Sequence, residues 1–264
     1  MEKIVFAKSW QGGFAGFGLE SFSDFFNFAG GKIINKNTKR DVQQLTLGNG
    51  DDSKVFFMKR FYRPYLKDIF FSWQNFGQPK PQAVIEWENA NFLLEKGIET
   101  YRPVCFGLRT RLGIEKKSFF ITEKLNGCCL TDFIAQRRGR LTQQQKEEII
   151  VQLAKMIRKV HDTGVSLPDL YLWHIFITEN AGQWEFAVID LHRMVRNVRD
   201  KNKQIMNLGR LHHSMLDKYF DDSLRWLFIE SYAADDWPGR AAKLGRKIKK
   251  YSNKVSAKRN PKQY

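Results

Sequence analysis

The chain has 264 residues, 42% of them hydrophobic, which suffices for one large globular domain or for two lobes. Its 44 Lys and Arg residues outnumber 28 Asp and Glu residues, and the net charge of +16 favours partners rich in phosphate. It has no secretory-signal pattern, no apolar run near the roughly 18 residues of a membrane span, and no disulfide or metal spacing among its cysteines, so we expect a cytoplasmic protein with reduced thiols.

Three short strands are expected in the N-terminal third of the chain. They cover residues 31–35, 41–47 and 54–61, where β-branched and aromatic residues are frequent. The segment GNGDDS, residues 48–53, has the Asn-Gly and Asp chemistry of a hairpin turn between the last two strands. The basic loop KNTKR, residues 36–40, joins the first two. This region therefore indicates a small antiparallel sheet.

The remainder of the chain is mainly helical in pattern, after an aromatic segment at 64–82 that is broken by prolines. One predicted helix ends at Gly97, and a longer one has Thr142 as its N-cap and stops at Gly164. The predicted order is helix 83–98, strand 118–125, helix 130–136 and helix 142–164.

Two acids follow the long predicted helix. Asp169 stands in SLPDLYLWHIFI, residues 166–177, with His174 five positions later, and Asp190 ends the apolar strand of WEFAVIDLHR, residues 184–193. A carboxylate among Leu, Tyr and Trp is costly without a purpose, although a turn residue and a strand cap are the alternative interpretations of the two acids. Protein-kinase-like folds present a catalytic acid and a metal-binding acid at this spacing, in H-R-D-x-x-x-x-N and D-F-G.

Residues upstream extend the kinase pattern. Lys59 lies on the third predicted strand, as the lysine of V-A-I-K does, unless it is simply a surface cation beside other basic residues. Glu86 or Glu88 of the next helix can pair with it, but two residues so close on a helix face different directions, so only one can do so. The stretch from Glu123 past Gly127 corresponds to the hinge between kinase lobes.

At these residues the sequence resembles the bacterial lipopolysaccharide core kinases, which phosphorylate heptose or Kdo sugars. The most specific part of this resemblance is D-x-Y-x-x-H followed by I-D-L-H-R, because ordinary protein kinases have Asn and Gly where this chain has His174 and His192. The resemblance implies an α+β, atypical protein-kinase-like fold with two lobes: a small antiparallel sheet with one main helix, then a mostly helical lobe. It spans roughly residues 30–215 and is carried by residues 83–107, 161–177 and 186–194.

The resemblance also implies a role for each charged residue. Lys59 would hold the α- and β-phosphates of ATP, and Glu86, which aligns with the family's glutamate, would hold Lys59. Asp190 would bind Mg²⁺, and Asp169 would accept or orient the proton of the sugar hydroxyl. His174 takes the place of a metal-binding Asn, which makes it a catalytic or metal-binding candidate. Imidazole is a poor Mg²⁺ ligand, and a buried structural histidine is the alternative.

The chain departs from ordinary kinases in several places. It lacks G-x-G-x-x-G before the third strand, since GFAGFGLES at 13–21 comes too early and is expected to form a loop. The turn at 35–40, with Lys39 and Arg40, is expected to cover the phosphates instead. No activation loop is evident, which favours a constitutively assembled site and a non-protein substrate. Asn207 stands where the family usually carries Asp.

We therefore expect a nucleotide-binding lobe at 1–122, a lobe with the catalytic and metal-binding loops at 123–238, and a basic tail at 239–264. The tail has ten Lys or Arg residues and no acid, so it is expected to attract the anionic inner-membrane surface, where the lipopolysaccharide core or a lipid A precursor would be the substrate. The alternative is a solvated tail that only aids solubility.

Two other functions are compatible with the sequence. One is a kinase-fold phosphotransferase that acts on protein or on another small molecule. The other is a non-catalytic kinase-like module that binds anionic membrane or nucleic acid through its basic surface. Retention of Lys59, Asp169 and Asp190 together favours an active enzyme, with no nucleic-acid partner expected.

Overall fold

Two compact units make up the chain in a computed structural model. One unit contains Met1–Glu95 with Tyr101–Leu125, and the other contains Lys96–Thr100 with Asn126–Tyr264. The division after Leu125 lies close to the limit at residue 122 expected from the sequence, and it leaves Glu123 in the first unit. The structure describes residues 1–11, 13–48, 50, 53–63, 66–137, 139–233 and 241–258.

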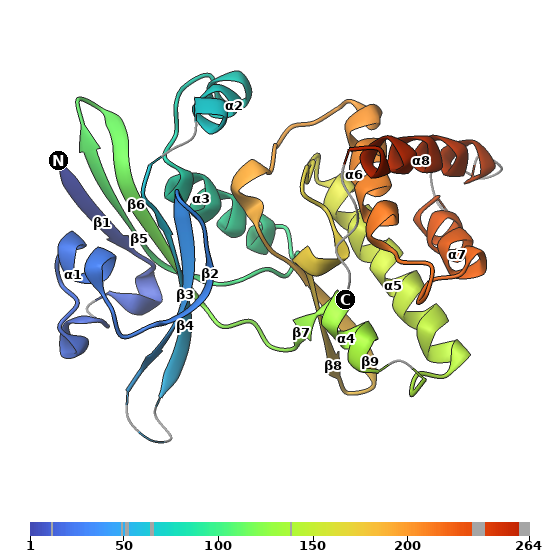
Figure 1. Ribbon diagram of the computed structural model, residues 1–264, viewed down its shortest axis with the longest axis horizontal. Helices are drawn as coiled ribbons and strands as arrows, with labels where there is room; N and C mark the ends of the chain where they lie inside the picture. The colour runs from blue at the N-terminus through green and yellow to red at the C-terminus, as the bar shows by residue number, and fades with distance from the viewer. Residues whose placement is uncertain are drawn as a thin grey trace. The chain divides into compact units, whose positions relative to one another are not determined.

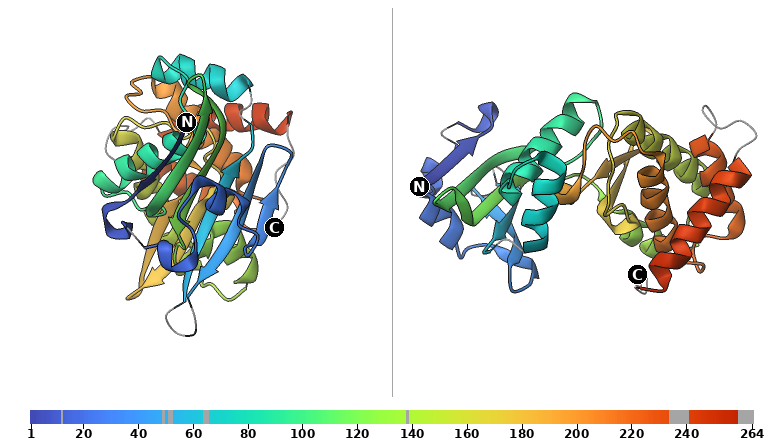
Figure 2. Two further views of the ribbon diagram at one scale, coloured as in Figure 1. Left: turned by 90° about the vertical axis from the view of Figure 1, so that its left-hand side faces the viewer. Right: turned by 90° about the horizontal axis from the view of Figure 1, so that it is seen from above.

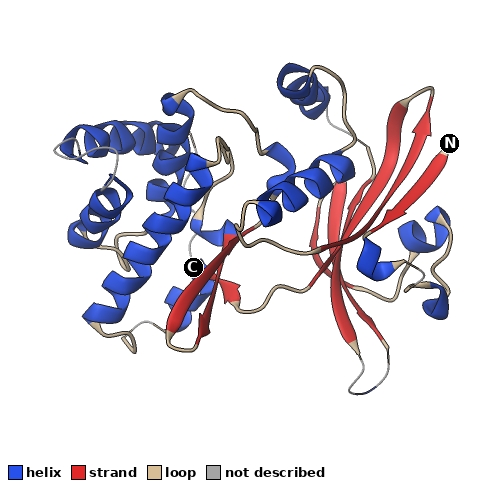
Figure 3. Ribbon diagram, turned by 180° about the vertical axis from the view of Figure 1, so that it is seen from behind, coloured by secondary structure: helices blue, strands red, loops and turns tan. Residues whose placement is uncertain are grey.

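A six-stranded antiparallel sheet forms the framework of the first unit (Figures 1 and 3). Its strand order is β1-β5-β6-β4-β3-β2, and the three strands predicted from the sequence are β2, β3 and β4. The bounds are β1 (Glu2–Phe6), β2 (Lys32–Lys36), β3 (Arg40–Leu47), β4 (Lys54–Phe61), β5 (Pro103–Arg111) and β6 (Ile114–Glu123).

The alternation of side chains along β4 determines where Lys59 points. Phe56, Met58 and Arg60 are buried on one face of the sheet, so Lys59, between two of them, projects from the opposite face. Helix α3 (Gln82–Glu95) packs on β5 and β6 and supplies the partner of Lys59 there. The alternation of side chains along β4 therefore places Lys59 on the face of the sheet that α3 covers.

An aromatic core covers the other face of the sheet. Helix α1 (Phe22–Asn27), capped by Ser21, brings Phe25 against Phe119, with ring centroids 5.0 Å apart. Phe14 is buried in the same cluster. The sequence predicted only a loop for 13–21 and no strand before it, whereas the structure has short 3-10 turns there and places β1 beside β5.

Helix α2 (Leu66–Phe76) occupies part of the proline-broken aromatic segment, where no helix was predicted. Two of its aromatic side chains lie on the surface: Phe70 is 61% exposed and Trp73 is 60% exposed. Helix α3 agrees with its prediction and is followed by Gly97 in the left-handed conformation, at φ 66°. None of the helices in the described ranges combines the length and the apolar character that a bilayer crossing requires.

The second unit is mostly helical, with a small sheet in the order β7-β8-β9 (Figure 1). Its long helix α5 begins as predicted, because Thr142 accepts a hydrogen bond from the backbone of Gln145 while the Gln145 side chain accepts one from Thr142 N–H. The bounds are β7 (Cys128–Cys129), α4 (Leu130–Gln136), α5 (Gln143–Asp162), β8 (Ile175–Asn180), β9 (Gln183–Val188), α6 (Lys201–Ser214), α7 (Asp222–Ala233) and α8 (Ala241–Ser256).

The segment expected to be a basic tail contains helix α8, which packs on α6 (Figure 2). Leu244, Ile248 and Ser252, four residues apart, are buried along one face. At Gly209 of α6 an added Cβ would lie 2.7 Å from the Tyr251 ring, so glycine permits this close contact. A solvated tail is therefore wrong for 241–256, although most cations of α8 stay exposed. Residues 239, 240 and 259–264 lie outside the described residues.

Candidate active site

A buried ion pair fixes Lys59 in the first unit. Lys59 Nζ lies 2.6 Å from Glu86 Oε1, and Glu86 Oε2 accepts a hydrogen bond from Tyr101 Oη at 2.7 Å. The Lys59 side chain is 16% exposed and that of Glu86 is 1% exposed, so their charges are little screened by water. Glu88 pairs instead with Lys80, at 2.9 Å. Glu86 is thus the glutamate that meets Lys59.

The turn between β2 and β3 is built by the side chain of Asn37. Asn37 Oδ1 accepts hydrogen bonds from the backbone N–H groups of Lys39 and Arg40, at 2.9 and 3.0 Å. The sequence led us to expect that this turn covers the phosphates. The N–H groups of Lys39 and Arg40 serve the turn itself, so these two residues have their basic side chains to offer a phosphate.

Glu123 ends β6 in contact with the N-terminal segment. The indole Nε1–H of Trp10 donates to Glu123 Oε1 at 3.0 Å, and Glu123 N–H donates to the Arg102 carbonyl at 3.0 Å. Trp10 also packs edge-on against Phe56 of β4, with ring centroids 5.1 Å apart. This link could not be predicted from the sequence, because Trp10 and Glu123 are far apart in the chain.

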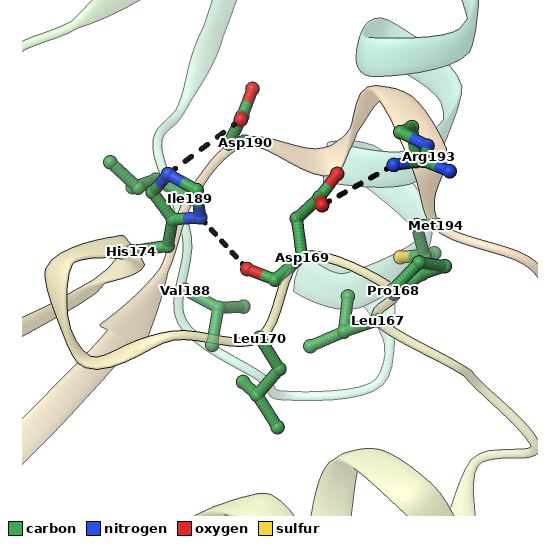
Figure 4. A pocket seen from close by; sticks show the side chains of 10 residues that line it. All are labelled: Leu167, Pro168, Asp169, Leu170, His174, Val188, Ile189, Asp190, Arg193 and Met194. Carbon is green, nitrogen blue, oxygen red and sulfur yellow. Dashed lines mark hydrogen bonds and ion pairs between the residues drawn. The ribbon is translucent and has the colours of Figure 1, made fainter. Parts of the chain in front are cut away.

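In the second unit, Asp169 and Asp190 line one small pocket (Figure 4). The loop after α5 presents Asp169, and the turn after β9 presents Asp190, as the sequence predicted for the ends of these segments. Both carboxylates are half-buried, with side chains 22% and 17% exposed. The pocket lining is Leu167, Pro168, Asp169, Leu170, His174, Val188, Ile189, Asp190, Arg193 and Met194.

Asn207 of α6 supports the loop that carries Asp169. Its Oδ1 atom accepts from Leu167 N–H at 2.8 Å and from the Ser166 hydroxyl at 3.1 Å. His161 Nε2 lies 3.3 Å from the same oxygen, and because an amide oxygen only accepts, this nitrogen carries the proton. His161 Nδ1 then accepts from Tyr232 Oη at 2.8 Å. Burial lowers the pKa of His161 to about 4, so the network is neutral at physiological pH.

His174 connects the loop that carries Asp169 to Asp190. Its Nδ1 lies 2.8 Å from the carbonyl oxygen of Asp169, so Nδ1–H donates to the loop backbone. The opposite nitrogen, Nε2, lies 3.8 Å from Asp190 Oδ2 (Figure 4). The sequence could not choose between a buried structural histidine and a functional one. The structure places His174 between the two acids, where it fixes the carbonyl of Asp169.

Asp190 adopts a left-handed backbone conformation, with φ 63° and ψ 59°. It caps the 3-10 turn η5 (Leu191–Arg193), and His192 Nδ1 donates to Asp190 Oδ1 at 3.0 Å. The Ile189 N–H donates to the His174 carbonyl at 2.9 Å, which ties the turn to the start of β8. The unusual conformation is therefore held on both sides of the residue, as is common for residues at functional sites.

Arg193 is a site residue that the sequence analysis did not single out. Its Nη1 atom lies 3.4 Å from Asp169 Oδ1, although the two residues are 24 positions apart. This arginine belongs to the I-D-L-H-R motif that the sequence analysis quoted. Its direction depends on the 3-10 turn η5, which points the side chain toward the loop that carries Asp169.

The donor atoms of the pocket match a hard divalent cation only in part. Asp190 offers carboxylate oxygens, which Mg²⁺ prefers. His174 offers a ring nitrogen, which Mg²⁺ binds poorly, so this expected metal ligand does not suit that ion. Of the two expected metal ligands, Asp190 therefore has donor atoms that suit Mg²⁺, and His174 does not.

Comparisons with known proteins agree with the resemblance found in the sequence. The family model described as "Lipopolysaccharide kinase (Kdo/WaaP) family" matches residues 35–232. "Lipopolysaccharide core heptose(I) kinase WaaP" of Escherichia coli strain K12 is 28% identical over 218 residues, which cover 78% of this chain and 80% of that protein. "3-deoxy-D-manno-octulosonic acid kinase" of Photobacterium damsela subsp. piscicida is 27% identical over 160 residues, which cover 57% of this chain and 62% of that protein.

The fold is also similar to a solved structure, "WaaP in complex with acyl carrier protein". The match has a TM-score of 0.68 at 22% identity and covers 94% of this chain and 99% of the other. The expected α+β kinase-like fold is therefore confirmed.

Proposed function

Because the chain belongs to the lipopolysaccharide kinase (Kdo/WaaP) family, we propose that it transfers the γ-phosphate of ATP to a hydroxyl group of heptose or Kdo in the lipopolysaccharide inner core. The observation that carries the proposal is the set of kinase residues in kinase positions. Lys59 is paired with the buried Glu86, and Asp169 and Asp190 line one pocket. The protein is thus a phosphotransferase with an alcohol acceptor.

Asp169 is the group that receives the acceptor. The sugar hydroxyl donates its hydrogen bond to the Asp169 carboxylate, which orients the oxygen toward the γ-phosphorus of ATP. The new bond forms between this oxygen and the γ-phosphorus, the bond from the γ-phosphorus to the bridging oxygen breaks, and ADP leaves. The hydroxyl proton passes to Asp169. His174 holds the carbonyl of Asp169, so the carboxylate approaches the acceptor from a fixed backbone.

The cations of the chain bind the negative charge of the nucleotide. Lys59, held by Glu86, binds the α- and β-phosphates, and the Lys39 and Arg40 side chains add positive charge beside the same sheet. Glu123 lies at the end of β6, where the kinase hinge begins. Mg²⁺, held by Asp190, would neutralise charge on the phosphates.

The basic surface of α8 suits a substrate that is attached to a membrane. Exposed cations line this helix at Lys243, Arg246, Lys247, Lys249, Lys250 and Lys254. They attract an anionic bilayer surface, and the exposed Phe70 and Trp73 of α2 can rest among headgroups. We place the enzyme as a peripheral protein on the cytoplasmic face of the inner membrane, acting on the lipopolysaccharide core or a lipid A precursor.

The decisive experiment measures transfer of labelled γ-phosphate from ATP to purified core lipopolysaccharide that lacks phosphate on heptose, on Kdo, or on both. Asp169→Asn is the test variant, and Asp162→Asn, an exposed acid on α5, is the matched control. Labelling by the native protein and the control, but not by Asp169→Asn, supports the proposal. Absence of labelled sugar with every acceptor, or equal labelling by Asp169→Asn, would contradict it.

Membrane attachment is tested by sedimentation with vesicles. Replacing Lys243, Lys247 and Lys250 of α8 by Gln should weaken binding to anionic vesicles by tenfold or more, because each lysine near the surface contributes about 1 kcal/mol. The control carries the same loss of charge on the exposed residues Lys3, Lys8 and Lys116. Equal weakening by both triple variants would show that α8 is not the attachment surface.

A further inference from the structure

Two of the arginine–aspartate pairs among the described residues differ in kind. In the first unit, Arg60 grips Asp41 with two donors, at 2.9 and 2.8 Å, and also donates to the Phe26 carbonyl at 2.8 Å. Its side chain is only 9% exposed. This is the geometry of an arginine that stabilises the fold, because a bidentate pair fixes both partners.

The second pair is looser and more open. Arg193 contacts Asp169 through one nitrogen at 3.4 Å, longer than the 2.7–2.9 Å that is usual for a charge-assisted hydrogen bond. The Arg193 side chain is 43% exposed, and it lines the pocket that also contains Asp190 (Figure 4). The arginine therefore contacts the catalytic acid without being fixed by it in the way that Asp41 fixes Arg60.

The position of Arg193 determines which part of the acceptor its guanidinium group can reach. A hydroxyl bound to Asp169 Oδ1 has its oxygen within about 6 Å of Arg193 Nη1, given a hydrogen bond of ordinary length to the same carboxylate oxygen. A substituent on the carbon next to that hydroxyl is thus within reach of the guanidinium.

The charge of the pocket favours an anionic substituent at this place. Asp169 and Asp190 would repel a carboxylate or phosphate of the acceptor unless a cation lay beside them. Among the ten residues drawn in Figure 4, Arg193 carries the only permanent positive charge. Its planar fork of donors also matches the paired oxygens of such a group.

We propose that Arg193 binds an oxyanion of the acceptor, a carboxylate or phosphate carried beside the accepting hydroxyl, and so selects an acidic sugar or an acidic neighbour of that sugar. This inference rests on the proposed kinase function and names the chemistry that its acceptor must have. Arg193 is a specificity-determining residue, and the enzyme recognises the negative charge of the acceptor as well as its hydroxyl group.

The test compares three forms of one acceptor, a deacylated inner-core oligosaccharide that lacks the phosphate to be added. One form is native, one has its carboxylates reduced to alcohols, and one has its remaining phosphates removed. Labelled ATP with Mg²⁺ is supplied in excess, and kcat/KM is measured for each form. The variants are Arg193→Met, Arg193→Lys and, as a matched control, Arg199→Met, which removes an exposed arginine from the same segment.

The native enzyme should prefer the native acceptor over one of the treated forms by about tenfold or more, the size expected for a charge-assisted hydrogen bond. The form that is disfavoured identifies the oxyanion as carboxylate or phosphate. Arg193→Met should bring the preference to within about twofold of none, Arg193→Lys should keep part of it because the charge remains, and Arg199→Met should keep all of it.

Several outcomes would overturn the inference. One is a native enzyme without any preference among labelled acceptors, and another is an unchanged preference in Arg193→Met. A third is an equal loss of kcat/KM on all three acceptors, which would mean that Arg193 acts only on Asp169. A fourth is a raised KM for ATP with the preference retained, which would assign Arg193 to the nucleotide. Failure of the native enzyme to label any form would instead remove the kinase function, and this inference with it.

Discussion

The two units hold their key charged residues in different ways. In the first unit, an opposite charge holds Lys59, because the buried carboxylate of Glu86 lies against its ammonium group. In the second unit, neutral groups hold the loop that carries Asp169, because Asn207 accepts hydrogen bonds from Leu167 N–H and from the Ser166 hydroxyl. A change of charge therefore breaks the first arrangement, whereas loss of a hydrogen-bonding partner breaks the second.

The difference has a physical reason. A lysine that binds phosphate needs its charge kept and its direction fixed, and a buried glutamate does both. A third carboxylate behind a loop that already has Asp169 and Asp190 nearby would add repulsion, which the amide of Asn207 avoids. Asn207 thus supports the loop firmly without adding a charge.

The largest effect should come from Asp169 itself. Asp169→Asn keeps the shape of the side chain but removes the group that takes the proton, so kcat should fall by about a thousandfold. ATP should still stabilise the variant against heat, because the substitution leaves the Lys59–Glu86 pair unchanged. Phosphate transfer measured at saturating ATP decides the point, and a kcat within tenfold of the native value would contradict the role of Asp169.

The next effect tests the charge-based arrangement. Glu86→Gln leaves Lys59 without its buried counter-charge and should lower the free energy of unfolding by about 3 kcal/mol and weaken ATP binding. Glu88→Gln is the matched control on the same helix. Its pair with Lys80 is more exposed and should contribute less than about 1 kcal/mol. Urea unfolding measures both, and equal effects of the two variants would remove the distinction between them.

A smaller effect tests the neutral arrangement. Asn207→Ala leaves the Leu167 N–H and the Ser166 hydroxyl without their buried acceptor, which should cost about 2 kcal/mol of stability and lower kcat more than it changes the KM for ATP. Asn202→Ala, at an exposed position of the same helix, should change neither. A purely structural role of Asn207 would lower stability and leave kcat per folded molecule unchanged.

The smallest effect is a pH dependence of stability. Burial lowers the folded-state pKa of His161 to about 4, below its ordinary value of 6.5, so the unfolded chain binds more protons between these limits. Stability should be fully present above pH 6.5 and should fall as the pH drops toward 4, by about 1 kcal/mol at pH 5.5 from this residue.

His161→Gln should flatten this slope without removing it, because burial also lowers the pKa of His212 to about 4. Urea unfolding at a series of pH values measures the slope for the native protein and the variant. An identical slope in both would show that His161 is not held neutral in the folded state.

Much of the fold was predictable where the pattern is local. The strand at β4, the capping of α5 by Thr142 and the end of α3 near Gly97 are set by neighbouring residues, and the structure agrees with all three predictions. That Asp169 and Asp190 lie close together was predictable, because one short hairpin separates them in the sequence.

Other features depend on contacts between distant residues and were missed. Phe25 of α1 contacts Phe119, although almost the whole sequence of the first unit separates the two residues. Arg193 reaches Asp169 because of the turn that follows β9. Helix α8 did carry a local signal, since Leu244, Ile248 and Ser252 repeat every four residues, but its high charge led us to expect a basic tail rather than a packed helix.

The left-handed backbone conformation at Asp190 restricts which amino acids can occupy this position. Among L-residues, Asp and Asn adopt this conformation most readily, and Gly adopts it without steric cost. Apart from Asn and Gly, any replacement adds about 1 kcal/mol or more of backbone strain, and every replacement except Glu also loses the carboxylate. A descendant that abandoned phosphate transfer but kept its fold would therefore carry Asn or Gly at residue 190, and inactive members of the lineage should be recognisable from that one letter of sequence.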